Sequence, residues 1–194
     1  AQKRLARDSA TALLRLQDET AGAPLARFAD AALLLEEATQ RELATIDSAR
    51  VFAAPAGPGE KLVTTARELV HRLATTLRAD LGMFYQQATG EVPIMKLSPE
   101  EKAAHEQIPE WAVPLAESLE KLRERPRVEG LHNFYAFEVL NLIDGQRTVL
   151  DIYRRVRAAA LAAGEWYYGP VELAKVKEVL AGAEKAGAVR FKPR

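Results

Sequence analysis

The sequence contains no cysteine among its 194 residues. This absence excludes disulfide bonds, zinc sites built on Cys and catalysis by a thiol. The chain also lacks net charge, because 27 Lys and Arg balance 27 Asp and Glu. A protein that binds nucleic acid over its whole surface is normally basic, so the charge balance argues against that class.

Long apolar runs and short catalytic motifs are also missing. No stretch approaches the roughly 18 apolar residues that cross a membrane, so we expect no membrane partner. The 3 histidines, His71, His105 and His132, form no His-Glu-x-x-His zinc motif. No serine stands between the glycines of a nucleophile elbow. The sequence therefore indicates no metal ligand and no catalytic residue in this chain.

The first half has the apolar periodicity of long helices. Apolar residues recur at helical spacing over three stretches, namely Leu5, Ala12 and Leu16, then Phe28, Leu35 and Leu43, then Leu62, Leu69 and Leu77. Breakers separate the stretches at Gly22-Ala23-Pro24 and at Pro55 to Gly59. We predict an antiparallel three-helix bundle over residues 1–90.

A proline-rich segment follows, with Pro93, Pro99, Pro109 and Pro114. Proline at this density excludes a single long helix, so we interpret residues 91–130 as a connector with short helices. Ser98-Pro99-Glu100-Glu101 is a capping box with Pro at the first helical position, which predicts one of these helices.

The last third, residues 131–194, has the pattern helix, turn, helix, turn, helix, strand. Phe134, Phe137, Leu140 and Ile143 form the apolar stripe of the first helix, Thr148 to Asp151 caps the second, and Leu173, Val176 and Leu180 face inward from the third. Val189 and Phe191 alternate with basic residues, as in a strand. We therefore predict an all-α chain, in which the antiparallel helical bundle is followed by a small winged-helix-like three-helix unit with a short C-terminal strand.

The densest aromatic segment is Gly164-Glu165-Trp166-Tyr167-Tyr168-Gly169-Pro170. Two interpretations stay open. The rings fill the gap between the last two helices, or they form a docking surface, because amphipathic rings are common anchors at interfaces. Together with Arg147, the residues Trp166, Tyr167 and Tyr168 are the candidate partner-binding residues.

Two segments carry a family resemblance. Leu140 to Ile152, which reads Leu-Asn-Leu-Ile-Asp-Gly-Gln-Arg-Thr-Val-Leu-Asp-Ile, and Gly164 to Val171 resemble the C-terminal region of bacterial M28-family peptidases. These enzymes are zinc-dependent, aminopeptidase-like and often exported. The Asp-Gly-x-Arg-Thr-Val-x-Asp-Ile core also resembles PqqD-type winged-helix units, which hold peptides. The resemblance extends over the last third of the chain.

The resemblance implies a non-catalytic accessory region of an exported M28-like zinc metallopeptidase. Such a region packs on the catalytic domain of the parent protein or helps to position the peptide substrate, in the periplasm or outside the cell. None of the family's zinc-ligand motifs occurs here, so we expect no cofactor in this chain and zinc only on a separate catalytic domain. The start at Ala1 without Met agrees with a piece of a longer protein.

Two alternatives remain. One is a stand-alone peptide- or protein-binding helical module that uses the candidate partner-binding residues. The other is a DNA-binding winged helix, which the basic residues Arg154, Arg155 and Arg157 favour. Residues 171–186 would enter the DNA groove, but they contain three glutamates among three lysines, and this mixed charge disfavours binding to a duplex. We therefore expect a protein or peptide partner rather than nucleic acid.

Overall fold

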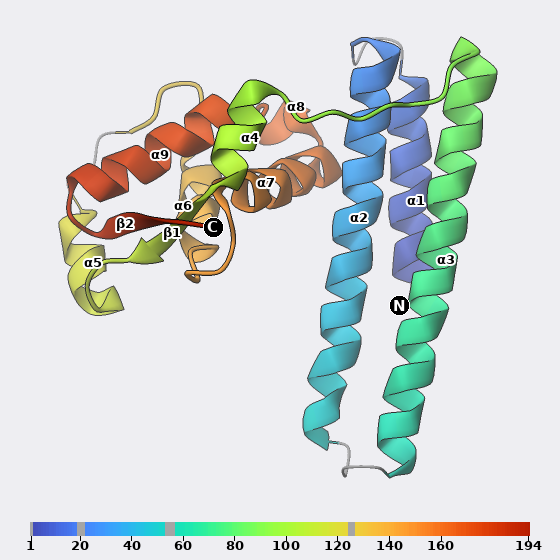
Figure 1. Cartoon of the computed structure of the whole chain (residues 1–194), viewed down its shortest axis with the longest axis horizontal. Coiled ribbons are helices and arrows are strands. Elements are labelled where there is room, and N and C mark those ends of the chain that lie inside the picture. Colours follow the sequence, from blue (N-terminus) through green and yellow to red (C-terminus); the bar gives the residue numbers. More distant parts are fainter. Residues whose placement is uncertain (1, 19–21, 53–56, 124–126) are drawn as a thin grey trace. The chain divides into compact units, whose positions relative to one another are not determined.

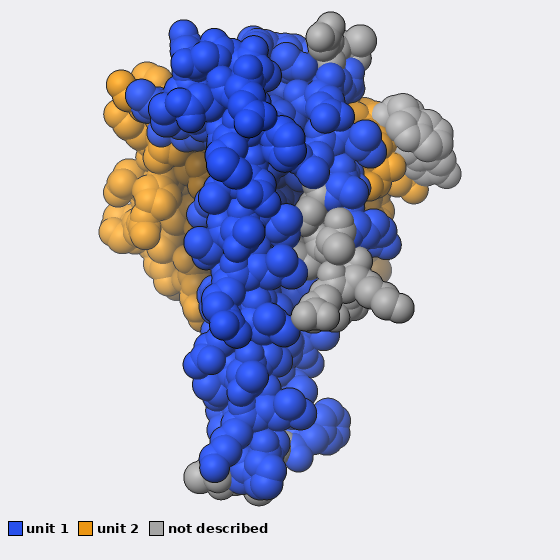
Figure 2. Space-filling model, turned by 90° about the vertical axis from the view of Figure 1, so that its right-hand side faces the viewer, with its two compact units in different colours: residues 1–95 blue, residues 96–194 orange. Residues whose placement is uncertain are grey.

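The computed structural model describes the chain except for residues 1, 19–21, 53–56 and 124–126. The chain divides into two compact units, unit 1 with residues 1–95 and unit 2 with residues 96–194 (Figure 2). Helices dominate both units, and the described residues form a single two-stranded sheet. The predicted all-α fold class is confirmed.

Unit 1 consists of three long helices that lie side by side (Figure 1). They are α1 (Gln2–Gln17), α2 (Pro24–Ser48), which continues into the short 3-10 helix η2 (Ala49–Phe52), and α3 (Pro58–Thr89). Pro24 and Pro58 stand at the first helical positions, where the missing N–H would have no intrahelical acceptor. Gly90 ends α3 with φ 76°, a left-handed conformation that glycine adopts without strain.

The buried face of α3 is rotated from the predicted one. The prediction placed Leu62 and Leu69 in the apolar stripe, whereas the structure buries the next residues, Val63 and Val70, and leaves Leu62 71% exposed. Neighbouring residues of a helix point in directions that differ by about 100° around the helix axis. Because each of these two leucines is followed by a valine, the sequence offers two adjacent stripes, and packing within the bundle buries the valine stripe.

A buried ion pair joins α1 to α2. The Nη2 atom of Arg15 lies 2.9 Å from Oδ2 of Asp30, and its Nε–H donates to the same oxygen over 3.2 Å. Asp30 is buried in the bundle. Buried carboxylates need such partners, so this pair favours one alignment of the two helices.

Unit 2 begins before residues 131–194, the predicted winged-helix-like segment, and includes them. It contains α4 (Pro99–His105), β1 (Gln107–Trp111), α5 (Leu115–Lys121), α6 (Asn133–Asn141), α7 (Val149–Ala163), α8 (Glu165–Tyr168), α9 (Leu173–Lys185) and β2 (Val189–Pro193). The helices α6, α7 and α9 surround one core, and its fully buried side chains include Tyr135, Val139, Ile152, Val176 and Leu180. The predicted connector, residues 91–130, contains the two short helices α4 and α5.

The strand β1 was not predicted. It lies in the proline-rich segment and pairs antiparallel with β2, with Gln107 opposite Pro193 and Trp111 opposite Val189. Each strand of a two-stranded sheet is an edge strand, so Pro109 is tolerated. Residues 96–130 thus belong to unit 2 rather than forming a separate linker.

Cross-strand ion pairs connect the two strands of this sheet. The carboxylate of Glu110 lies 2.7 Å from Nε of Arg190 and 3.0 Å from Nζ of Lys192. The hydrogen bond from Lys192, followed by that from Arg190, lowers the pKa of Glu110 below its usual value. The carboxylate therefore stays ionised and paired at neutral pH.

The predicted apolar stripe of α6 is right for its second half and wrong for its first. Leu140 and Ile143 are buried, but Phe134 and Phe137 are 46% and 55% exposed. The first half of α6 instead buries the side chains of Tyr135 and Ala136. Two phenylalanine side chains on successive turns of α6 are therefore left at the surface.

Candidate partner-binding surface

Aromatic side chains gather where α6 begins and α8 ends. The ring of Tyr168 lies 4.5 Å from the His132 ring and 5.5 Å from the Phe134 ring, measured between centroids. Phe137 follows Phe134 by three residues, so the two side chains are neighbours on the same face of α6. We call His132, Phe134, Phe137 and Tyr168 the aromatic surface.

Local structure positions both ends of this surface. His132 is the N-cap of α6, and its Nδ1 accepts a hydrogen bond from the N–H of Phe134 over 3.2 Å. Gly164 and Gly169 flank α8 with φ angles of 85° and 79°, which favour glycine. The chain turns at these two glycines, so the short helix α8 places Tyr168 against α6.

Tyr135 lies beneath the aromatic surface, with its ring edge-on to Tyr168 at a centroid distance of 5.9 Å. The ring is 1% exposed, and its hydroxyl has no hydrogen-bond partner among the described residues. Burial, followed by the nearby Glu165 and Tyr168, raises the pKa of the Tyr135 hydroxyl. It therefore remains a protonated donor at neutral pH.

Of the three candidate residues on α8, the structure places Tyr168 in the aromatic surface. Its ring stacks on Phe134 and lies tilted against His132. Trp166 and Tyr167 lie in the same helical turn, but their side chains are outside the described part of the structure.

Arg147 lies elsewhere, in the turn between α6 and α7. Its guanidinium donates to the carbonyl of Leu142 over 3.2 Å and pairs with the Asp144 carboxylate at 2.9 Å. Tyr168 lies against the first turn of α6, whereas Arg147 donates to Leu142, directly after the last turn. The two candidates are therefore at opposite ends of α6, whose 9 residues span about 14 Å.

The motif around Arg147 builds the turn itself. The Oδ1 atom of Asp144 accepts hydrogen bonds from the N–H groups of Gln146 and Arg147, each over 2.9 Å. Burial opposes ionisation of the Asp144 carboxyl, but these two donors and the Arg147 charge outweigh it, so its pKa is lowered. Thr148 and Asp151 then form the predicted capping box of α7. The Asp-Gly-x-Arg-Thr sequence thus has a local structural role.

Three members of the aromatic surface were not among the candidate residues, namely His132, Phe134 and Phe137. A signal was present, because α6 reads Asn-Phe-Tyr-Ala-Phe-Glu-Val-Leu-Asn and carries apolar residues around most of its circumference. Such a helix either is buried on all sides or has a face left for a partner. The sequence alone does not distinguish these cases.

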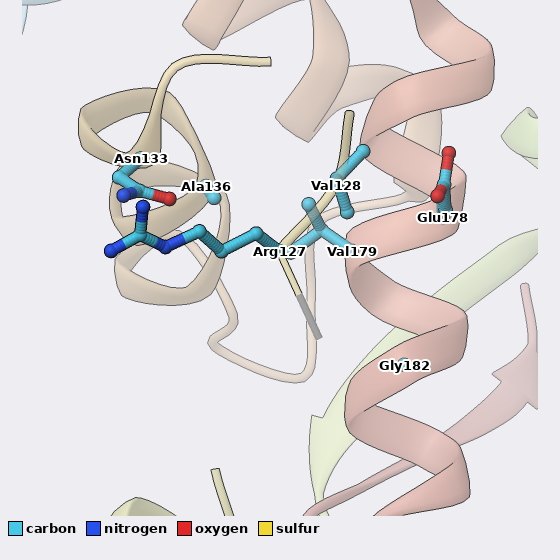
Figure 3. Close-up of a pocket in the computed structure, with 7 residues that line it drawn as sticks. All are labelled: Arg127, Val128, Asn133, Ala136, Glu178, Val179 and Gly182. Atoms are coloured by element: carbon cyan, nitrogen blue, oxygen red, sulfur yellow. The ribbon is translucent and has the colours of Figure 1, made fainter. Parts of the chain in front are cut away.

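Unit 2 also contains a small pocket between α6 and α9. It has a volume of about 90 Å³ and is lined by Arg127, Val128, Asn133, Ala136, Glu178, Val179 and Gly182. Figure 3 shows the Arg127 side chain extended toward Asn133, while Glu178 points away from both. Pockets for organic ligands are usually larger than about 300 Å³. This pocket is therefore too small to be the main site.

The histidines are placed separately. His132 caps α6, His105 contacts the guanidinium of Arg194, and His71 is exposed on α3. Within the part of the chain that the structure describes, no three His, Asp or Glu side chains are grouped so that they could hold a metal ion.

None of the described helices combines the length and the apolarity that a membrane span requires.

Comparison of the chain with protein-family models, with curated proteins and with solved structures gives no match.

Proposed function

We propose that this chain is a non-catalytic protein-binding module and that the aromatic surface of unit 2 is its contact site. The supporting observation is the exposure of Phe134 and Phe137, at 46% and 55%, on successive turns of one helix. Full burial of an exposed phenylalanine side chain contributes roughly 1.5–3 kcal/mol, and covering the exposed half of each of these two contributes about half of that. Aromatic side chains also dominate the energy of many interfaces. A partner that covers these rings therefore gains much of its binding energy there.

The resemblance suggests the partner. In this proposal the chain is the accessory region of an M28-like zinc metallopeptidase, and the aromatic surface packs on the catalytic domain. There it supports the domain or helps to position the peptide substrate, while the zinc ligands and the catalytic residues belong to the partner. The alternative partner is a peptide that the surface holds directly.

A binding experiment tests the proposal with a matched pair of variants. Phe137→Ala and Leu119→Ala each remove a large apolar side chain that is 55% exposed, but Leu119 lies on α5. We expect the full chain to bind the M28-like catalytic domain from the same organism in isothermal titration calorimetry. Phe137→Ala should weaken this binding about tenfold or more, as expected for an interface anchor. Leu119→Ala should change it less than twofold.

Two results would contradict the proposal. Equal affinities of the two variants would remove the aromatic surface as the contact site. Chelator-sensitive peptide hydrolysis by the chain alone, in the presence of zinc, would contradict its non-catalytic character. If only a peptide binds, and Phe137→Ala weakens that binding, the partner is a peptide rather than the domain.

A further inference from the structure

Unit 1 contains a second concave feature, at the end of the bundle where α1 and α3 end and α2 begins. This bundle-end pocket has a volume of about 470 Å³ and is lined by side chains of all three helices. They include Leu13 and Leu16 of α1, Arg27 of α2, and Phe84 and Ala88 of α3. The volume lies within the range of about 300–1,000 Å³ that is typical of pockets for small organic ligands.

Arg27 supplies a positive charge to this pocket. Its side chain is half-buried, and its Nε–H is shielded from solvent without a hydrogen-bond acceptor among the described residues. Arg15 of the same bundle, by contrast, pairs with Asp30. The described residues that line the pocket include no Asp and no Glu. The charge of Arg27 therefore favours an anionic ligand.

The rest of the pocket is apolar or aromatic. Leu13, Leu16 and Phe84 line it together with Tyr85. The Tyr85 ring is buried and packs edge-on against Phe28, with a centroid distance of 5.2 Å, so this part of the wall is held in place by the core. An apolar body fits such a wall better than a fully polar anion does.

We propose that the bundle-end pocket binds a carboxylate that is attached to an apolar body. The carboxylate pairs with Arg27, whose planar guanidinium can donate two parallel hydrogen bonds to it. The apolar body lies against Leu13, Leu16 and Phe84. Such a ligand is either a free fatty acid or the C-terminus of a hydrophobic peptide. This site is in unit 1 and does not depend on the aromatic surface.

Titration calorimetry of the full chain tests this site with decanoate and, as a neutral counterpart, decanol. A second pair of probes is the peptide Ala-Leu-Leu with a free C-terminus and its C-terminal amide. We expect at least one carboxylate to bind and its neutral counterpart to bind at least tenfold more weakly. Binding of decanoate alone assigns the site to free acids, and binding of the peptide acid alone assigns it to C-termini.

Three variants connect the binding to the pocket. Arg27→Gln should weaken carboxylate binding at least tenfold, whereas Arg78→Gln, at an exposed arginine of α3, should change it less than twofold. Ala88→Trp fills the pocket from an exposed position and should abolish binding even if Arg27→Gln disturbs folding. The proposal is overturned if neither carboxylate binds, or if Ala88→Trp binds as well as the unmodified chain.

Discussion

The ring of Phe134 stacks on the ring of Tyr168, with centroids 5.5 Å apart and planes inclined by 19°. The contact joins the first turn of α6 to the single turn of α8, although one side of Phe134 stays exposed. The exposed ring of Phe134 is thus held in place before a partner arrives. A preorganised surface loses less conformational entropy on binding, which supports the proposed role of this surface.

A double-mutant cycle tests this stacking. Replacing Phe134 or Tyr168 with Leu keeps an apolar side chain but removes one ring of the pair. Aromatic pairs contribute about 0.5–1.5 kcal/mol beyond the area they bury. We therefore expect a coupling energy of that size between Phe134→Leu and Tyr168→Leu in urea unfolding followed by circular dichroism. Strictly additive effects would show that the rings do not interact in solution.

The core of unit 2 predicts a large loss of stability for Leu180→Ala. Leu180 lies on α9, and its side chain is fully buried in the core of unit 2. Its truncation should lower the free energy of unfolding by about 2–5 kcal/mol, because it removes apolar contacts and leaves a cavity. The exposed Leu119 is the control, and Leu119→Ala should change stability by less than about 0.5 kcal/mol. Similar unfolding curves for the two variants would contradict this placement of the core.

The capping box of α7 predicts a smaller and more specific effect. The Oγ1 atom of Thr148 accepts from the N–H of Asp151 over 3.1 Å, and the Asp151 carboxylate accepts from the N–H of Thr148 over 3.0 Å. Thr148→Ala should destabilise the chain by about 1 kcal/mol, since it leaves a helical N–H without its acceptor. Thr148→Ser keeps the hydroxyl and should recover most of the loss in thermal or chemical unfolding.

The Asp144 turn predicts a dependence of stability on pH. The folded chain holds the pKa of Asp144 below its ordinary value of 3.8. A lowered carboxyl pKa contributes stability above the unfolded value, and that contribution is lost as the pH falls through the folded pKa. Asp144→Asn should therefore be less stable than the original chain at neutral pH, and the difference should shrink below pH 3.8.

Urea unfolding at a series of pH values measures this difference. Arg147→Gln should reproduce part of the effect, because the Arg147 charge is one cause of the lowered pKa of Asp144. A difference between the original chain and Asp144→Asn that stays constant down to the most acidic pH would contradict the assignment.

The family resemblance remains a hypothesis that the binding and hydrolysis experiments test. Its strongest motif, the sequence around Arg147, has a complete local explanation in the turn between α6 and α7. Turn chemistry of this kind suits many helical proteins, so the motif alone does not identify a function.

The sequence by itself determined where most helices begin and end. Pro24, Gly90 and the capping box at Thr148 act on atoms within one or two helical turns, so neighbouring residues are sufficient to predict them. The inward positions of α9 were also predictable, because only one face of that helix is apolar.

Only the tertiary structure decided the features that depend on residues distant in the sequence. The strand β1 pairs with β2, which lies about 80 residues later in the chain, the bundle buries Val63 rather than Leu62, and Tyr168 contacts Phe134 although α7 lies between them in the sequence. In each case the local sequence is compatible with more than one arrangement. Burial against a distant partner then selects one of them, and no neighbouring residue carries that information.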